Sequence, residues 1–279
     1  MKKCLLLLII YLLCNVTCIA GTQRALIFGL GKQEDPSWSK INGDKDVELV
    51  AQMLNGAGFT DIRIVKNEQA TKKDMEMAFL GLIKRCRKGD IVYIHYSGHG
   101  QFMSDIDGDE ATRWEGKHAQ WDEAWIPYDA YMTYCDKDKG DKHFCDDEIA
   151  NYLTQIREAV GNDGNIYVVI DACHSGDATR GNDDEIVRGV DIPFILPRHP
   201  NAKEAPSIEE QWLTISACKP FQLCFEQKNP IAGKLTYALY LLGAKMFGMS
   251  NGELQAWLDG YLEAHPARVS QNPVVSGKK

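Results

Sequence analysis

Two short stretches hold the residues whose types and spacing are suited to catalysis: HYSGHGQ at 95–101 and VVIDACHSGD at 168–177. In each, an apolar run ends at a polar turn that contains glycine, with His99 in the first turn and Cys173 in the second. A thiol becomes an effective nucleophile when a nearby imidazole favours its thiolate form. The pair therefore predicts Cys173 as a nucleophile and His99, distant in the chain, as its acid–base partner.

His174 is the competing candidate for the base, because it directly follows the cysteine. Successive side chains of an extended segment point to opposite sides, so we expect His174 to face away from the sulfur of Cys173. Both residues of the predicted pair also have structural alternatives. A single cysteine after a buried strand is often a small core residue, and a histidine is often a hydrogen-bonded polar group. The position of both residues in turns after apolar strands favours catalysis.

Alternating strands and helices must position these two turns. Uninterrupted apolar runs predict strands, and an apolar period of three to four residues predicts helices between them. Buried strands separated by helices indicate an α/β fold with a parallel sheet covered on both faces. Such sheets carry their sites at the carboxyl ends of the strands. The predicted strands are 24–30, 61–65, 91–95, 166–170 and 211–216, and the predicted helices are 44–56, one beginning at 71, 146–160, 235–246 and 253–264.

Two long segments, 101–145 and 177–210, interrupt this pattern. The first is acidic and contains tryptophans at 114, 121 and 125, and the second is rich in charge and proline. Loops of this length in a compact domain are usually functional or disordered. The tryptophans are expected either to line a binding cleft or to pack the loop.

The charge and the first residues of the chain indicate partners and location. The formal net charge of −8 argues against a nucleic-acid partner, which usually requires a basic surface. Residues 1–20 have a basic start, a short apolar run and a small-residue exit, the pattern of a cleaved secretory signal. We therefore expect export to the periplasm or the cell exterior, with a lipid anchor at Cys18 as the alternative. No later apolar stretch is long enough for a membrane span.

Six cysteines follow the predicted signal. Export permits disulfides, and Cys135 and Cys145 flank a polar loop across which they could pair. With His143 they could instead bind zinc, but a fourth ligand is not obvious. The chain has no CxxC motif, so a redox or metal-binding thiol protein ranks last among the functions considered.

The stretches YSGHG and DACHSG, in this order and separation, resemble the two catalytic signatures of the caspase-like cysteine peptidases, in the metacaspase and bacterial caspase-family branch. The resemblance extends over nearly the whole chain after residue 20. It implies a three-layer α/β/α sandwich with a mostly parallel central sheet. It also implies one peptidase domain, 21–279, with a large part (21–176), a linker (177–210) and a small part (211–279). Further similar stretches are INGDKDVELVAQML, DIDGDE, WDEAWIPYDA, DDEI, TISACKPFQLCFE and GKLTYAL.

The resemblance implies a cysteine endopeptidase that acts on a peptide or protein substrate. Cys173 would attack the carbonyl carbon, and His99 would handle protons, chiefly for the leaving amine. The backbone N–H groups of Gly100 and Cys173 would form the oxyanion hole. The alternative is a catalytically inactive caspase-like domain used for binding or regulation, but the intact Cys–His pair speaks against it.

In the metacaspase branch an acidic pocket selects arginine or lysine before the cleaved bond. Asp171 matches one acid of that pocket, and Asp46 matches the other with a one-residue ambiguity in the alignment. Carboxylates favour a cationic side chain through charge-assisted hydrogen bonds. The structural alternatives are a turn cap for Asp171 and an ordinary first-turn helix acid for Asp46. We expect cleavage after Arg or Lys.

Some metacaspases bind calcium through acids that match Asp129, Asp146 and Asp147. The fourth acid of that set falls at Arg180 here, where a cation repels the metal, so we expect that no cofactor is required. The linker carries several cationic side chains. If the pocket is acidic, one of them is a candidate for self-cleavage: Arg180, Arg188, Arg198 or Lys203.

Overall fold

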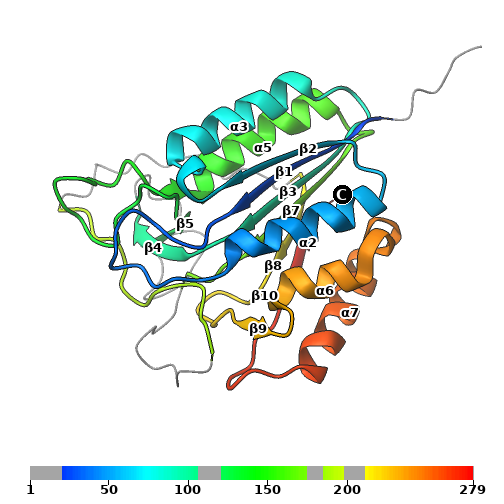
Figure 1. The fold of residues 1–279 in the computed structure, drawn as a ribbon. Helices are drawn as coiled ribbons and strands as arrows, with labels where there is room; N and C mark the ends of the chain where they lie inside the picture. The colour runs from blue at the N-terminus through cyan, green and yellow to red at the C-terminus, as the bar shows by residue number, and fades with distance from the viewer. Residues whose placement is uncertain (1–20, 106–120, 175–184, 198–210, 279) are drawn as a thin grey trace, which may run out of the picture.

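A six-stranded sheet forms the centre of the computed structural model, which describes residues 21–105, 121–174, 185–197 and 211–278 (Figure 1). Its strand order is β11-β8-β7-β3-β1-β2. Neighbouring strands are parallel, except that β11 runs antiparallel to β8 at one edge. The mostly parallel sheet is therefore confirmed. Its strands are β1 (Gln23–Gly29), β2 (Asp61–Lys66), β3 (Ile91–Ser97), β7 (Asn165–Asp171), β8 (Leu213–Ser216) and β11 (Val274–Gly277).

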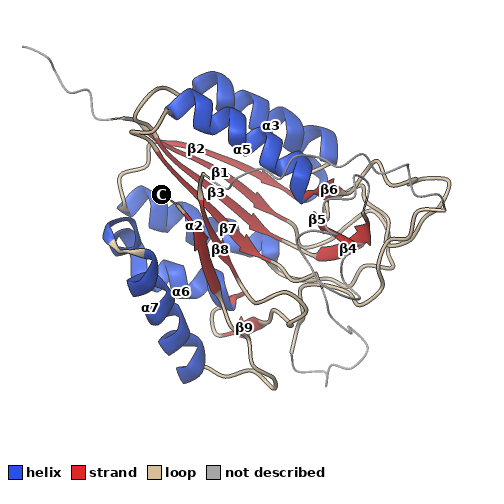
Figure 2. Cartoon of the chain, turned by 180° about the vertical axis from the view of Figure 1, so that it is seen from behind, coloured by secondary structure: helices blue, strands red, loops and turns tan. Residues whose placement is uncertain are grey.

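Helices cover both faces of this sheet (Figures 1 and 2). One face carries α3 (Lys72–Arg85) and α5 (Asp146–Val160). The other carries α2 (Gly43–Gly56), α6 (Lys234–Leu242) and α7 (Asn251–Ala264). A separate hydrophobic cluster lies beneath each helical layer, and the three-layer α/β/α sandwich is confirmed.

The strand β1 shows how one apolar run fills both clusters. Leu26 and Phe28 belong to the cluster beneath α3 and α5, whereas Ala25 and Ile27 belong to the opposite one. All four are fully buried, because successive side chains of a strand point to opposite faces of the sheet. An uninterrupted apolar run is therefore the sequence signal of a strand covered on both sides.

Local signals set the ends of two helices. The helix predicted to begin at 71 is capped by Thr71, whose hydroxyl accepts a hydrogen bond from the Asp74 N–H at the start of α3. The helix predicted over 235–246 is shorter in the structure. Gly243 adopts a positive φ of 62° directly after α6, a conformation that glycine accepts readily. The 3₁₀ helices are η1 (Asn67–Gln69) and η2 (Gly243–Gly248).

Short strands that the sequence did not reveal form two smaller sheets. β4 (Gly100–Ser104), β5 (Trp121–Trp125) and β6 (Phe144–Cys145) form an antiparallel sheet within the segment predicted as a long loop. β9 (Glu226–Lys228) and β10 (Ile231–Gly233) form a hairpin. The residues of β4 (GQFMS) and β5 (WDEAW) do not alternate between apolar and polar, and β6, β9 and β10 have only two or three residues, so none carries the usual signal of a strand.

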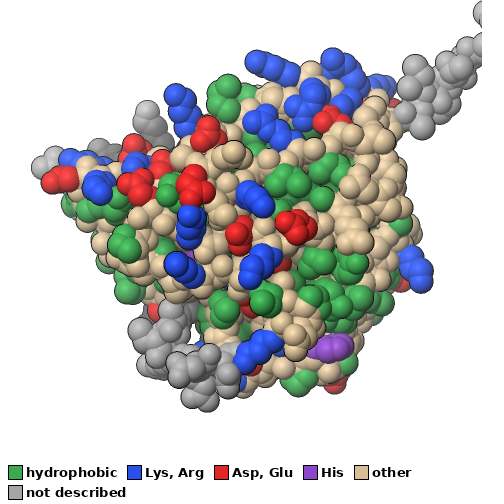
Figure 3. Space-filling model, viewed as in Figure 1, with side chains coloured by type: hydrophobic (Ala, Val, Ile, Leu, Met, Phe, Trp, Pro, Cys, Tyr) green, Lys and Arg blue, Asp and Glu red, His purple; other side chains and the backbone are tan. Residues whose placement is uncertain are grey.

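The described residues contain no helix long and apolar enough to cross a membrane. On the face seen in Figure 3, Lys and Arg side chains gather over α3, and acidic side chains mix with basic ones elsewhere. Several positions discussed above lie outside the described residues: the predicted signal 1–20 with Cys18, Trp114, Arg180, Arg198 and Lys203.

Candidate active site

The carboxyl ends of β3 and β7 meet at one edge of the central sheet. The two strands are parallel neighbours, and Ser97 stands beside Asp171 in their register. His99 and Cys173 each follow two residues later, so the two predicted turns lie side by side. The turns are in close contact, because a Cβ placed on Gly100 would lie 2.6 Å from the carbonyl oxygen of Cys173. Glycine at position 100 is what permits this approach.

His99 is fully buried, and its neighbours fix its ring. Its Nε2 lies 2.8 Å from the carbonyl oxygen of Ser39, and its ring packs against Trp38 with a centroid distance of 5.1 Å. Because a carbonyl oxygen only accepts, Nε2 must carry the proton of this hydrogen bond. Burial lowers the pKa of His99 to about 4, although the bond to Ser39 acts in the opposite direction. Its Nδ1 has no hydrogen-bond partner among the described residues and is available as a base.

Cys173 is buried beside this histidine turn. Its main-chain N–H donates a hydrogen bond of 2.8 Å to the carbonyl oxygen of Arg188. His174 has other neighbours, since its Nδ1 lies 3.4 Å from a carboxylate oxygen of Glu123. Its ring also lies close to Gly100, where an added Cβ would be 2.8 Å from Cδ2 of His174, and its orientation relative to the sulfur stays a prediction.

The other cysteines are poor candidates for a nucleophile. Cys135 and Cys145 are not joined by a disulfide, so the pairing of the two does not form. The reason is the position of Cys145, which is buried with its sulfur 3.0 Å from that of Met103. Burial raises the pKa of Cys145, Cys218 and Cys224 well above the ordinary value of a thiol. These three thiols therefore stay protonated at neutral pH.

His143, which was considered as a zinc ligand with Cys135 and Cys145, has a packing role. The Nε2–H of His143 donates a hydrogen bond of 2.8 Å to Oε1 of Gln101, and its Nδ1 lies 3.5 Å from a carboxylate oxygen of Asp138. Its ring packs on Phe194 with a centroid distance of 4.3 Å. Within the described part of the chain, no three His, Cys, Asp or Glu side chains are grouped so that they could hold a metal ion.

The three acids considered for calcium are also not gathered into such a group. Asp129 accepts a hydrogen bond of 2.9 Å from the main-chain N–H of Lys72. Asp146 and Asp147 lie in the first turn of α5, where acidic side chains stabilise the positive end of a helix. These residues do not fit a calcium ion as they stand, and no step of the chemistry below depends on one.

The two acids predicted for the specificity pocket are brought together beneath Cys173. Asp46 and Asp171 are both fully buried. Asp171 accepts hydrogen bonds of 2.8 and 2.6 Å from the N–H and hydroxyl of Thr236. Asp46 accepts one of 3.1 Å from the N–H of Gly233. Burial raises the pKa of Asp46 to about 6, and an adjacent arginine opposes this rise.

That arginine is Arg188, whose guanidinium lies between the carboxylates. Its Nη1 is 2.6 Å from Asp46 and 3.6 Å from Asp171. Its Nε and Nη2 are 3.1 and 3.0 Å from Glu226, an acid that the sequence analysis did not select. Burial alone would lower the pKa of Arg188, but the three carboxylates raise it well above its ordinary value. The pocket therefore holds a charged guanidinium.

Gly233 leaves the space that this side chain fills. A Cβ at this position would lie 2.1 Å from Oδ2 of Asp171 and 2.5 Å from Nη1 of Arg188. The backbone conformation of Gly233 is extended, with a φ of −62°, so any residue could adopt it. Space in the pocket, rather than backbone freedom, is the reason for glycine here.

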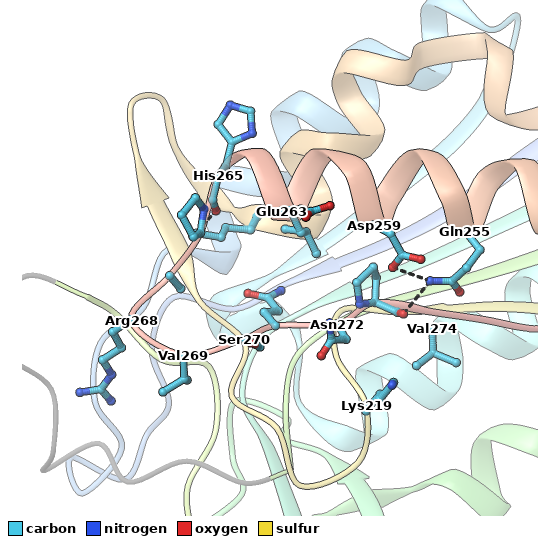
Figure 4. Close-up of a pocket in the computed structure, with 16 residues that line it drawn as sticks. Lys219, Gln255, Asp259, Glu263, His265, Arg268, Val269, Ser270, Asn272 and Val274 are labelled. Atoms are coloured by element: carbon cyan, nitrogen blue, oxygen red, sulfur yellow. Dashed lines mark hydrogen bonds between the residues drawn. The ribbon is translucent and has the colours of Figure 1, made fainter.

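The acidic pocket is filled by Arg188, and a large open cavity lies apart from it. A cavity of about 800 Å³ lies between α7 and the chain before β11 (Figure 4). Gln255 spans its wall, with hydrogen bonds of 2.9 Å to Asp259 and to the carbonyl of Pro273. Neither Cys173 nor His99 lines this cavity, so its size does not identify the reacting centre.

Comparison with known proteins finds relatives among the metacaspases. Metacaspase-1B of Aspergillus fumigatus is 26% identical over 200 residues, which cover 66% of this chain and 42% of that protein. Metacaspase-1 of Sclerotinia sclerotiorum is 30% identical over 200 residues, which cover 66% of this chain and 39% of that protein. The matched region thus spans about two fifths of the length of these curated relatives.

Solved structures share the fold. Protein GSU0716 from Geobacter sulfurreducens superimposes with a TM-score of 0.61 at 21% identity, covering 92% of this chain and 94% of that one. Caspase-1 from Spodoptera frugiperda gives a TM-score of 0.58 at 11% identity, covering 92% and 87%. The family model described as the caspase domain, peptidase C14, matches residues 22–240. Since that match covers most of its residues, the chain belongs to the caspase family of cysteine-type peptidases.

Proposed function

We propose that this protein is a cysteine endopeptidase that hydrolyses peptide bonds after arginine, and less efficiently after lysine. Cys173 is the nucleophile and His99 its acid–base partner. The observation that carries the proposal is the buried acidic pocket beside Cys173. Three carboxylates, those of Asp46, Asp171 and Glu226, surround one guanidinium there.

The tautomer of His99 determines how protons move in the proposed mechanism. Because Nε2 is held by the carbonyl of Ser39, Nδ1 takes the proton of the Cys173 thiol and later gives it to the leaving amine. The sulfur attacks the carbonyl carbon of the substrate. The N–H of Cys173, together with that of Gly100, stabilises the resulting oxyanion. Losing one such donor typically slows acyl transfer about 10²- to 10³-fold.

The pocket geometry favours arginine over lysine. Nε and Nη2 of Arg188 both face Glu226, while Nη1 faces Asp46. A guanidinium presents donors along several directions, so it satisfies acids on different walls, whereas an ammonium is a compact charge on a flexible stem. An aspartate side chain would add a fourth negative charge to this site.

Matched reporter peptides test the proposal. Three peptides that differ only in Arg, Lys or Asp before the cleaved bond are incubated with purified protein and with its Cys173→Ala variant. We expect the order Arg, then Lys, with no measurable hydrolysis of the Asp peptide, and no hydrolysis by the variant. Equal or faster turnover of the Asp peptide contradicts the specificity, and unchanged turnover by Cys173→Ala contradicts the mechanism.

We also propose that the chain is exported after removal of residues 1–20. The basic start, apolar run and small-residue exit support this proposal. Mass spectrometry of the protein from its natural host is expected to find a mature N-terminus at Gly21. A protein that retains residues 1–20 contradicts the cleaved signal, and a lipid attached to Cys18 would identify the alternative anchor.

A further inference from the structure

A short segment of the chain lies in the proposed site as a bound peptide would. Residues 186–188 run antiparallel to residues 224–226, with Val187 bridged to Phe225. The N–H of Arg188 donates to the carbonyl of Cys224 at 3.0 Å, and the N–H of Glu226 donates to the carbonyl of Ile186 at 3.0 Å. Adding a strand in this way is a general mode of peptide binding, in which main-chain bonds give affinity and pockets give specificity.

The peptide bond after Arg188 lies at the reacting centre. The carbonyl oxygen of Arg188 accepts the N–H of Cys173 at 2.8 Å, the donor assigned above to the oxyanion hole. The next residue lies against the sulfur, because a Cβ placed on Gly189 would be 2.7 Å from Sγ of Cys173 and 2.2 Å from its carbonyl oxygen. The side chain of Arg188 meanwhile fills the acidic pocket. Carbonyl, side chain and following residue are thus all placed as in a substrate.

We propose that the Arg188–Gly189 bond is the protein's own first substrate, cut by Cys173 of the same molecule, and that the uncut segment keeps other peptides out of the site. The inference rests on the proposed function, because it uses the same nucleophile and pocket. It selects one bond within the predicted linker 177–210, and one of the four cations that the sequence left open.

The reaction consumes one water molecule. The Cys173 thiolate forms a C–S bond to the carbonyl carbon of Arg188, and the C–N bond to Gly189 breaks. The protonated Nδ1 of His99 gives its proton to the departing Gly189 amine. Water, deprotonated by His99, then attacks the thioester. The C–S bond breaks, which restores the thiolate beside protonated His99 and leaves on Arg188 a carboxylic acid that loses its proton to solvent.

The two new chain ends are held differently. On the Gly189 side, the chain continues along β4, where Phe194 exchanges main-chain hydrogen bonds of 2.8 and 2.9 Å with Phe102 and Ser104. The ring of Phe194 is fully buried against His143, so this side stays in place after the cut. On the other side, the new carboxylate of Arg188 faces a site already rich in acids. We therefore expect the segment ending at Arg188 to be the one that leaves.

The experiment follows the freshly purified full-length protein over time at two concentrations that differ about 100-fold. Mass spectrometry is expected to find a new N-terminus at Gly189, formed at the same first-order rate at both concentrations, because the reaction is intramolecular. The Cys173→Ala variant is expected to stay intact. In the wild type, hydrolysis of the arginine reporter should rise in step with this cut.

Three variants separate the possible outcomes. Arg188→Ala should show no cut after position 188 and should hydrolyse the reporter without a lag. Arg188→Ala removes the cation from a buried acidic pocket, whereas Arg188→Lys keeps a cation there and therefore serves as the second test. Arg188→Lys should be cut at least about 10-fold more slowly than wild type. Arg198→Ala, which changes another arginine of the same linker, is the matched control and should be cut as wild type is.

The result also distinguishes this inference from the proposed function. If the protein hydrolyses the arginine reporter while the 188–189 bond stays intact, or is cut only elsewhere, the inference is wrong and the function stands. A cut whose rate rises with protein concentration contradicts the intramolecular step. If wild type, Arg188→Ala and Arg188→Lys all fail to hydrolyse the reporter, and neither wild type nor Arg188→Lys cuts its own chain, the inference and the proposed function are both wrong.

Discussion

The main-chain N–H of Cys173 and the carbonyl oxygen of Arg188 form a hydrogen bond of 2.8 Å. This single contact joins the turn that carries the nucleophile to the arginine that fills the acidic pocket. Both groups are buried, and three carboxylates surround the positive charge of the arginine.

Replacing His99 by glutamine should slow peptide hydrolysis without unfolding the protein. A glutamine amide can still donate to the carbonyl of Ser39, but it supplies no base in place of Nδ1. General acid–base catalysis typically contributes about 10²- to 10⁴-fold, so kcat for the arginine reporter should fall within that range. His174→Gln is the matched control, because His174 lies beside Glu123, and it should retain kcat within about 3-fold. A larger loss in His174→Gln than in His99→Gln would identify the wrong histidine.

The pH dependence of reporter hydrolysis should reveal the ionisation of Asp46. Burial raises the pKa of this carboxyl to about 6, while Arg188 lowers it. When the side chain of Arg188 has left the pocket, it no longer lowers the pKa of Asp46, so this pKa should be about 6 or higher. The carboxylate, rather than the neutral acid, attracts the substrate cation, so kcat/KM should fall as the pH drops through this value. In Asp46→Asn this acidic limb should be lost and kcat/KM at pH 8 should be lower. An unchanged limb would assign it to another group.

Glu226 should determine the preference for arginine over lysine. A hydrogen bond to a charged group typically contributes about 1.5–3 kcal/mol, so Glu226→Gln should reduce kcat/KM for the arginine reporter by about 10- to 100-fold. The loss for the lysine reporter should be smaller, because a single ammonium cannot use the two contacts at Nε and Nη2. Comparing the two reporters in wild type and variant measures this difference. Equal losses would indicate that Glu226 provides only general negative charge.

Alanine at position 233 should narrow the pocket. Its Cβ would lie 2.1 Å from Asp171, so kcat/KM for the arginine reporter should fall at least about 10-fold, through a higher KM. Gly248→Ala is the matched control, since a Cβ there meets nothing within 4 Å. Full activity in Gly233→Ala would show that arginine side chains bind somewhere else.

A metal chelator should leave hydrolysis of the arginine reporter unchanged. The described residues show no group of acids able to hold an ion, and the mechanism proposed here uses none. Initial rates in EDTA and in added calcium provide the measurement. Loss of activity in EDTA that calcium restores would instead support a site at Asp129, Asp146 and Asp147.

The sequence predicted the parallel core well, because long apolar runs and helical periods are local signals. The run containing Leu26 and Phe28 reads as a buried strand whatever surrounds it. The strands β4 to β6 escaped detection because their residues become a sheet only through pairing partners distant in the chain. For the same reason β11 was not expected at the edge of the sheet.

The same distinction applies to the candidate site. His99 and Cys173 could be chosen because each follows an apolar strand and carries reactive chemistry. Glu226 could not, since an acid in a short hairpin shows no local sign of its distant partner. Arg188 was one of several linker cations, and only the folded chain distinguishes it, by closing three acids around its side chain.

The most direct measurement of the central claim is the site and selectivity of covalent labelling. A peptide that ends in arginine and carries a thiol-reactive group is incubated with protein whose cleavage after Arg188 is complete, and the adduct is located by mass spectrometry. We predict a single adduct on Cys173, formed much faster than with the aspartate version of the peptide. An adduct on Cys145, Cys218 or Cys224 instead, or equal labelling by the two peptides, would contradict the account.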